Sequence, residues 1–289
     1  AGVDPQRILD ELSRDNIVIV AGFQGVTDDL DITTLGRGGS DTTAVAIAAG
    51  ISADRCEIYT DVQGIYTADP KIVPNARQID EIGFGEMLEL ASYGAKMNPR
   101  SIELGMAYNI PITVTSSFTE TSGTTIHKLE VDEMDIKVGE RDRVIGIPTE
   151  KKVAKITILG VVDRPGIAAN IFEPLAESGI SVDVIVQNSS VDGTTDLTFT
   201  VSHADVPKAE EILQSLALEM RSRSVVTDKE LAKVSVVGAG IQDRPGYAAK
   251  MFRTLADANV NIEMITTSDI RITCIVREAQ VEEAARVLH

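Results

Sequence analysis

The sequence predicts an α/β protein in two parts: a mostly parallel sheet with helices on both faces, followed by two ferredoxin-like units. Two observations predict this architecture. In residues 1–127, buried-type strands alternate with helices, which is the pattern of a parallel sheet. In the remainder, Asp163-Arg164-Pro165-Gly166 returns as Asp243-Arg244-Pro245-Gly246. This internal repeat predicts two copies of one β-α-β-β-α unit.

The elements of the first part follow from start signals and apolar runs. Asp4-Pro5 is a helix start with proline at the first helical position. Ile17–Gly22 is a continuous β-branched run ended by glycine, which predicts a strand buried on both faces. Further strands are expected at Cys56–Val62 and Ile110–Val114, and helices at Phe84–Gly94 and Ile102–Ala107.

A glycine-rich segment, Thr33–Ala44 (TTLGRGGSDTTA), precedes an Ala-rich run. This order predicts a loop that leads into the N-terminus of a buried helix, where backbone N–H groups attract anions. Arg37 can bind a carboxylate or phosphate through two hydrogen bonds. Ser40 and Asp41 lie beside it at a strand-to-helix crossing, where ligands bind in such sheets. A purely structural glycine turn is the alternative.

A second polar segment follows the next expected strand. That strand ends in Thr60 and Asp61, at the same edge of the sheet, and a polar loop runs from Tyr66 to Lys71. One interpretation is a simple turn at Asp69-Pro70. The functional interpretation is a nucleotide pocket. There Asp61 or Asp69 would bond the ribose or base, Tyr66 would pack against the ring, and Lys71 would meet phosphate.

The repeat predicts the elements of both copies. Strands are expected at Lys155–Leu159, Val182–Val186 and Asp196–Val201, and again at Val234–Val237, Ile262–Ile265 and Ile270–Val276. The first copy has a candidate fourth strand at Arg223–Thr227, whereas the second has none after its last helix. Arg143–Pro148 is an orphan strand, and we expect it to complete the second copy's sheet. The predicted boundaries are 1–127, a linker at 128–142, 143–228 for the first copy and 229–289 for the second.

Composition excludes several classes of protein. The 289 residues carry a formal charge of −17, which argues against a nucleic-acid surface. Cys56 and Cys274 show no paired spacing, so a disulfide framework or zinc site is not expected and a reducing, cytoplasmic compartment is favoured. No apolar run approaches the roughly 18 residues that span a bilayer. His127, His203 and His289 show no metal or triad spacing.

These segments together resemble aspartate kinase. The strings are TLGRGGSDTTA at 34–44, TDV at 60–62, GIYTADP at 64–70 and SSF at 116–118, and the 163–289 repeat resembles paired ACT domains. The resemblance implies part of an amino-acid-kinase domain followed by two ACT domains. It also implies transfer of the γ-phosphoryl group of Mg-ATP to the side-chain carboxylate of L-aspartate. That nucleophile is already an anion, so catalysis rests on positioning and charge neutralisation.

The resemblance implies roles for individual residues. Arg37, Ser40 and Asp41 match positions that hold aspartate, and Lys96 matches a lysine that contacts the ATP phosphates. A lone lysine is otherwise a solvated surface residue. The nucleotide loop is matched by Thr60, Asp61, Tyr66, Asp69 and Lys71.

The ACT repeat implies regulation by amino acids. Threonine and lysine, singly or together, are the implied effectors, bound between ACT domains of neighbouring chains in a homo-oligomer or heteromer. The matching positions are Asp163, Gly166, Ile167, Ala168 and Gln187 in the first copy and Asn261, Ile262, Ser268 and Asp269 in the second. A plain helix cap at Asp163 is the alternative.

One feature of the family is not found in residues 1–289. The family carries a lysine-containing KFGG-type glycine loop, and this string is absent here. We therefore expect a polypeptide of these residues alone to show little or no kinase activity, since one preorganised cationic donor contributes about 10²–10³ in rate. The alternatives are a non-catalytic amino-acid-binding regulatory chain and a sister kinase for another acidic substrate. The glycine loop argues against the first and the ACT repeat against the second.

Overall fold

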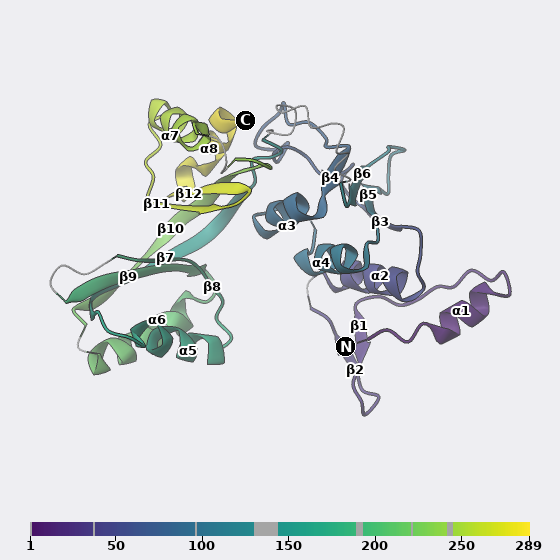
Figure 1. The fold of residues 1–289 in the computed structure, drawn as a ribbon, viewed down its shortest axis with the longest axis horizontal. Coiled ribbons are helices and arrows are strands. Elements are labelled where there is room, and N and C mark those ends of the chain that lie inside the picture. Colours follow the sequence, from purple (N-terminus) through teal and green to yellow (C-terminus); the bar gives the residue numbers. More distant parts are fainter. Residues whose placement is uncertain are drawn as a thin grey trace.

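The computed structural model describes residues 2–36, 38–95, 97–129, 144–188, 193–220, 222–241 and 245–289. Figure 1 shows a first part with a small sheet and its helices beside a second part built on one long sheet. The mixed α/β class predicted from the sequence is confirmed. Most of the predicted linker lies outside the described residues.

Four strands form the sheet of the first part, in the order β3-β5-β6-β4. They are β3 (Cys56–Thr60), β5 (Ile112–Ser116), β6 (Thr124–His127) and β4 (Glu81–Gly83). β3 and β5 run parallel, as do β4 and β6, whereas β5 and β6 are antiparallel. The register places Thr60 beside Ser116, so β3 and β5 end at the same edge of the sheet.

Three helices pack into one core with this sheet: α2 (Gly39–Gly50), α3 (Phe84–Ser92) and α4 (Pro99–Tyr108). Val45, Met87 and Ile102 are fully buried in it, one from each helix. The other face of β3 carries Glu57 and Tyr59, which are exposed. The helical layer of the described residues therefore lies against one face of β3.

The prediction of a buried strand at Ile17–Gly22 is wrong for this structure. Ile17 and Ile19 are 94% and 93% exposed, and no strand of the described residues pairs with this segment. An apolar run forms a strand only where a neighbour accepts and donates its backbone hydrogen bonds. The predicted first helix is present as α1 (Gln6–Leu12), and β1 (Gln24–Val26) pairs with β2 (Ile32–Thr34) as a short hairpin.

The second part is one six-stranded sheet in the order β11-β12-β10-β7-β9-β8. Its strands are β7 (Thr149–Val162), β8 (Val182–Gln187), β9 (Thr194–Ser202), β10 (Ser224–Val237), β11 (Met264–Ser268) and β12 (Arg271–Arg277). Its helices are α5 (Ile167–Glu177), α6 (Val206–Glu219), α7 (Tyr247–Asp257) and α8 (Val281–Leu288), the last preceded by the short 3-10 helix η1 (Glu278–Gln280). α5 and α6 cover one end of the sheet, and α7 and α8 cover the other (Figure 1).

The two repeat copies share their longest strands. Residues 224–228 of β10 pair with the later half of β7, in the first copy, whereas residues 231–234 pair with the beginning of β7. Segment 144–148 lies beside the second copy, where Ile145 donates its backbone N–H to Val237 over 2.7 Å. Ser235 likewise donates to the Pro148 carbonyl over 3.1 Å. The beginning of β10 thus extends the sheet of the first copy, whereas residues 144–148 and the beginning of β7 extend the sheet of the second.

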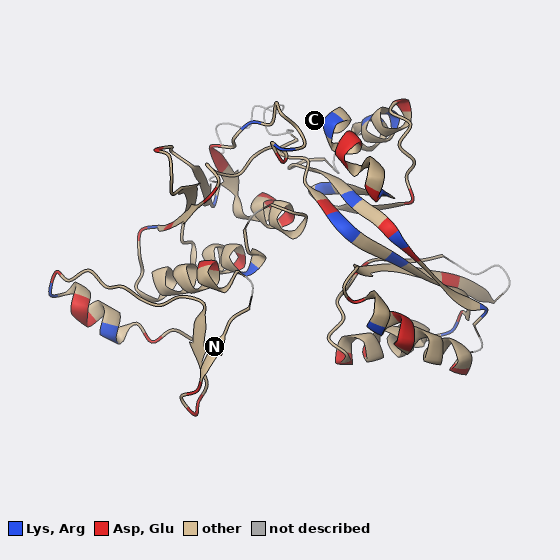
Figure 2. Ribbon diagram, turned by 180° about the vertical axis from the view of Figure 1, so that it is seen from behind, with Lys and Arg blue, Asp and Glu red and all other residues tan. Residues whose placement is uncertain are grey.

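Charged side chains of both signs lie on the surface of both parts (Figure 2). Figure 2 shows Lys and Arg alternating with Asp and Glu along the long strands of the second part. None of the helices that the structure describes is long and apolar enough for a membrane span. Cys56 and Cys274 are buried free thiols, and burial raises the pKa of Cys274 to about 12.

Candidate functional site

The glycine-rich segment forms the start of α2. Gly38 precedes the helix with a φ of 73°, a left-handed conformation that favours glycine. The side chain of Asn98 occupies the space where a Cβ atom of residue 38 would lie. Ser40 is exposed in the first turn of α2. Arg37 lies outside the described residues, so its predicted position here stays a prediction.

Asp41 is half-buried beside the same asparagine. Burial raises the pKa of its carboxyl group, and a hydrogen bond from the Asn98 backbone lowers it by a smaller amount. The net shift is upward, which is the expected result where desolvation of a carboxylate dominates. The start of α2 is therefore a helix N-terminus that carries the Ser40 hydroxyl and the Asp41 carboxyl group and is closed on one side by Asn98.

The predicted nucleotide loop borders a cavity of about 190 Å³. Its lining includes Tyr66, Asp69 and Lys71 from the loop and, from elsewhere, Leu90, Gly94, Ala95, Pro148 and Thr149. Asp69 also accepts a hydrogen bond from the backbone N–H of Lys71 over 2.9 Å, which is the local contact expected of a turn at Asp69-Pro70. The structure thus brings three of the predicted nucleotide residues to one cavity.

Thr60 and Asp61 do not line this cavity, although Val62, the next residue, does. The Thr60 hydroxyl donates to Asp61 over 3.2 Å at the end of β3, and the Thr60 carbonyl accepts from the Ser117 backbone over 2.8 Å. The SSF string of the sequence therefore meets the end of β3. Residues 115–122 and Tyr59 border a separate hollow there, of about 590 Å³.

A five-residue segment, 94–98, joins the cavity to the start of α2. Gly94 and Ala95 line the cavity, and Asn98 contacts Gly38 and Asp41. Four residue steps span at most about 14 Å. Lys96 lies within this segment in the sequence but outside the described residues. The sequence did not predict the role of Asn98 or the walls at Pro148 and Thr149. Asn98-Pro99 has the pattern of a helix start, and Asn98 is the N-cap of α4.

Four of the first copy's predicted effector residues lie at the start of α5, and the fifth, Gln187, ends β8. Gly166 precedes this helix with a φ of 89°. The Ile167 side chain is buried in the core and that of Ala168 packs against it, so a ligand at this turn would meet backbone N–H groups rather than these side chains. Asp163 and Gln187 are exposed, at the turn before α5 and at the end of β8.

The second copy's predicted effector residues separate into two groups. Asn261 and Ile262 precede β11, whereas Ser268 and Asp269 lie at its other end. Six residue steps of extended chain span about 20 Å. One amino acid cannot contact both groups of one chain. The Ser268 hydroxyl donates to Glu89 of α3 over 3.0 Å.

Comparisons with known proteins agree with this arrangement. The model of the amino acid kinase family matches residues 2–116, and ACT domain models match 155–218 and 234–289. Aspartokinase of Corynebacterium glutamicum is 48% identical over 99% of this chain and 68% of its own length. The chain belongs to the aspartokinase family. Aspartate kinase of Pseudomonas putida is 47% identical over 99% of the chain and 69% of its own length.

Solved aspartokinase structures share the fold. Escherichia coli aspartokinase III in complex with aspartate and ADP (R-state) is 30% identical, with a TM-score of 0.79, over 98% of this chain and 62% of that one. The same enzyme in complex with lysine and aspartate (T-state) gives a TM-score of 0.72 at 30% identity, over the same shares. Clostridium acetobutylicum aspartate kinase gives 0.80 at 27% identity, covering 98% and 65%. The chain spans about two thirds of these aspartokinases.

Proposed function

We propose that the protein transfers the γ-phosphoryl group of ATP to the side-chain carboxylate of L-aspartate. The observation that carries this proposal is the segment 94–98, which joins the cavity at Tyr66 and Lys71 to the start of α2. A phosphoryl donor and an acceptor must lie close together for transfer to occur. The E. coli aspartokinase III structure, which contains aspartate and ADP, supports the assignment.

The nucleotide would occupy the cavity. Tyr66 offers a ring face to the base and Lys71 a cation to the phosphates, with Lys96 as a second cation. Mg²⁺ takes oxygen ligands, usually substrate phosphates with one or two carboxylates. Asp61 and Asp69 offer such oxygens, and the bound ion would neutralise phosphate charge. In the part of the chain that the structure describes, no cluster of three potential metal ligands occurs.

Aspartate would bind at the start of α2. Its carboxylates suit the backbone N–H groups of the helix N-terminus, the Ser40 hydroxyl and the Arg37 guanidinium. Asp41 offers an acceptor for the α-ammonium group. The attacking carboxylate needs no general base, so these residues act by orienting the nucleophile and by neutralising developing charge.

Calorimetric titration of ADP and of L-aspartate tests this proposal. We expect Lys71→Met to weaken ADP binding about tenfold and Lys71→Arg to weaken it less, because arginine keeps the charge. Aspartate binding should be unchanged in both variants. Equal ADP affinity in wild type and Lys71→Met would contradict the proposed pocket. An assay of acyl phosphate formation with the polypeptide 1–289 tests the separate expectation of weak turnover.

The ACT domains would bind threonine, lysine or both, between chains of a homo-oligomer or heteromer. The E. coli aspartokinase III complex with lysine supports an amino-acid effector. Titration of threonine and lysine, singly and mixed, with light scattering for oligomeric state, tests this. Asp163→Asn should weaken effector binding and leave ADP binding unchanged. A chain that binds an effector but neither ADP nor aspartate would be the non-catalytic regulatory alternative.

A further inference from the structure

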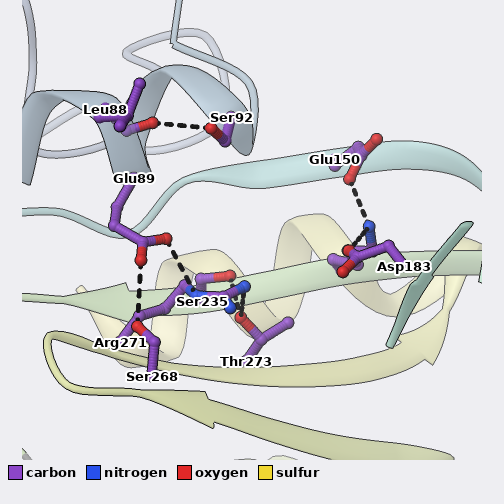
Figure 3. Close-up of polar contacts among 10 residues, drawn as sticks. Leu88, Glu89, Ser92, Glu150, Asp183, Ser235, Ser268, Arg271 and Thr273 are labelled. Carbon is purple, nitrogen blue, oxygen red and sulfur yellow. Dashed lines mark hydrogen bonds and ion pairs between the residues drawn. The ribbon is translucent and has the colours of Figure 1, made fainter. Parts of the chain in front are cut away.

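One face of α3 lies against the sheet of the second ACT domain through charged groups. Glu89 Oε2 lies 3.1 Å from Arg271 Nε, and Glu89 Oε1 accepts the hydrogen bond from Ser268 (Figure 3). Arg271 is only 8% exposed, and its Nη1 donates to the Thr273 hydroxyl over 3.1 Å. Glu86, one turn earlier, accepts a hydrogen bond from the Ala239 backbone. The helix is therefore held along its length by the second ACT domain.

Tyr93, the residue after α3, contacts two cations of the second ACT domain, one of which is paired with the first ACT domain. The Arg271 guanidinium carbon lies 4.2 Å from its ring centroid and Lys233 Nζ lies 5.3 Å from it. Lys233 also forms ion pairs with Asp183 over 2.7 Å and Glu150 over 2.9 Å (Figure 3). Asp183 belongs to β8 in the first ACT domain. Two buried cations thus face one aromatic ring, which is a favourable contact when desolvated.

The same end of α3 forms a wall of the proposed nucleotide cavity. Leu90, Gly94 and Ala95 line it, and Tyr93 lies between them in the sequence. Gly94 has a φ of 115° and packs so closely on the Thr149 carbonyl that a Cβ atom has no space. Thr149 begins β7 and also lines the cavity. Movement of the ACT sheet relative to α3 would therefore change the shape of this wall.

We propose that Tyr93 is a positioning residue for nucleotide binding: its contact with Arg271 and Lys233 holds the cavity wall at Gly94 and Ala95. This inference rests on the proposed function, because it assigns the cavity to the nucleotide. It also gives the ACT domains a direct route to the kinase site. A ligand at Ser268 would compete with Glu89 for the hydroxyl, and a shift of β8 would act on Lys233 through Asp183.

The test uses the 289-residue chain with Tyr93→Leu and Tyr93→Phe. Leucine removes the aromatic face, whereas phenylalanine keeps it, so the pair separates the cation–ring contact from bulk packing. Amide exchange by mass spectrometry reports on residues 84–95 without any ligand. We expect exchange there to rise about 5- to 30-fold in Tyr93→Leu and less than about twofold in Tyr93→Phe. The dissociation constant of ADP should rise in parallel.

A second variant keeps the inference testable if Tyr93→Leu fails to fold. Glu89→Gln keeps the shape and an acceptor for Ser268 but removes the charge opposite Arg271, and it should raise exchange at 84–95 severalfold. Arg253→Met, on the exposed face of α7, is the control and should change nothing. Unchanged exchange in both Tyr93→Leu and Glu89→Gln overturns the inference. Failure of the wild-type chain to bind ADP would count against the proposed function, while the exchange result still decides whether the junction holds this wall.

Discussion

Ile147 donates its backbone N–H to the Thr67 carbonyl over 2.7 Å, which ties the loop of the proposed nucleotide cavity to the segment entering the ACT sheet. The connection continues in the core. Ala68 and Val73 of that loop pack in the same hydrophobic cluster as Val234 and Leu255 of the second ACT domain. A shared core couples the stability of the parts that contribute to it. The kinase loop and the second ACT domain should therefore unfold together.

The first prediction concerns Val73, which is 1% exposed in this shared core. Val73→Ala removes two methyl-sized groups and leaves a cavity, so we expect the free energy of unfolding to fall by about 1–3 kcal/mol. Urea unfolding followed by circular dichroism measures this. Val226→Ala, on an exposed position of β10, is the control and should change it by less than about 0.5 kcal/mol. If Val73→Ala loses protection from amide exchange in the kinase loop alone, and the second ACT domain is unaffected, the core is not shared.

The second prediction separates the two reasons for glycine at position 38. Gly36 and Gly38 both have a positive φ, of 79° and 73°, but only Gly38 faces a neighbouring side chain, that of Asn98. Gly36→Ala should cost about 1 kcal/mol from backbone strain. Gly38→Ala should cost at least about 1 kcal/mol more, because a packed side chain must also move.

Thermal unfolding and L-aspartate titration together check this prediction. Gly38→Ala should also weaken aspartate binding severalfold, since Asn98 contacts Asp41 as well. The double variant Gly38→Ala with Asn98→Ala should recover part of the lost stability. Equal melting temperatures for Gly36→Ala and Gly38→Ala would show that Asn98 yields without cost.

Local patterns predicted most of the fold, and long-range contacts account for what they missed. The repeat predicted both ACT units because each strand and helix has its own period and turn signals. Ile17–Gly22 shows the limit of this reasoning. Its β-branched run indicates that the segment can be buried. A strand also needs a neighbouring strand for its backbone hydrogen bonds, and nothing within the run indicates where that neighbour lies.

The site residues likewise fall into those that a local pattern could group and those that only long-range packing brings together. Tyr66, Asp69 and Lys71 could be grouped from the sequence because one short loop carries them. Pro148 and Thr149 complete the cavity from far along the chain, and no local signal marks them. The contact of Tyr93 with Lys233 and Arg271 could likewise not be predicted from the sequence, since it depends on how α3 packs against a sheet far along the chain.

The third prediction uses the raised pKa of Asp41. A carboxyl group whose pKa is raised by burial adds stability at low pH, and this contribution is lost as pH rises through the folded-state pKa. At pH 7 the charged Asp41 therefore costs stability that asparagine would not. We expect Asp41→Asn to melt at a higher temperature than wild type at pH 7, with the difference vanishing below about pH 4. L-Aspartate affinity should fall at least about tenfold, because the proposed acceptor for the ammonium group loses its charge.

Thermal unfolding at several pH values checks the expected melting temperatures, and calorimetric titration at pH 7 checks the expected loss of L-aspartate affinity. Asp54→Asn, at an exposed position, is the matched control and should leave melting temperature and affinity unchanged. A lower melting temperature for Asp41→Asn at both pH 7 and pH 4 would mean that the hydrogen bond from Asn98 outweighs the desolvation of the carboxylate.

The last prediction concerns Lys233, which is 5% exposed between Asp183 and Glu150. Burial acts to raise the pKa of Asp183, but the hydrogen bond and charge of Lys233 outweigh it and lower that pKa. For Lys233, burial acts to lower the pKa, yet the two carboxylates raise it. The contribution of the lowered Asp183 pKa is fully present above the unfolded-state value of about 4 and is lost as pH falls through the lower folded-state pKa. That of the raised Lys233 pKa is fully present below the unfolded-state value of about 10 and is lost as pH rises through the higher folded-state pKa.

Lys233→Met should lower the free energy of unfolding by about 1–3 kcal/mol at pH 7, less than for a fully buried pair because both carboxylates are partly exposed to water. The loss should begin to shrink as pH falls below about 4, because the unfolded chain then binds a proton that Asp183, with its lowered pKa, resists in the folded state. Lys151→Met, which breaks the exposed pair with Glu282, is the same chemical change and should cost less than about 1 kcal/mol. Urea unfolding at pH 3 and pH 7 measures all of these values. A loss for Lys233→Met that is equal at both pH values would mean that Lys233 stabilises the junction through the contact of its ammonium group with the Tyr93 ring rather than through Asp183.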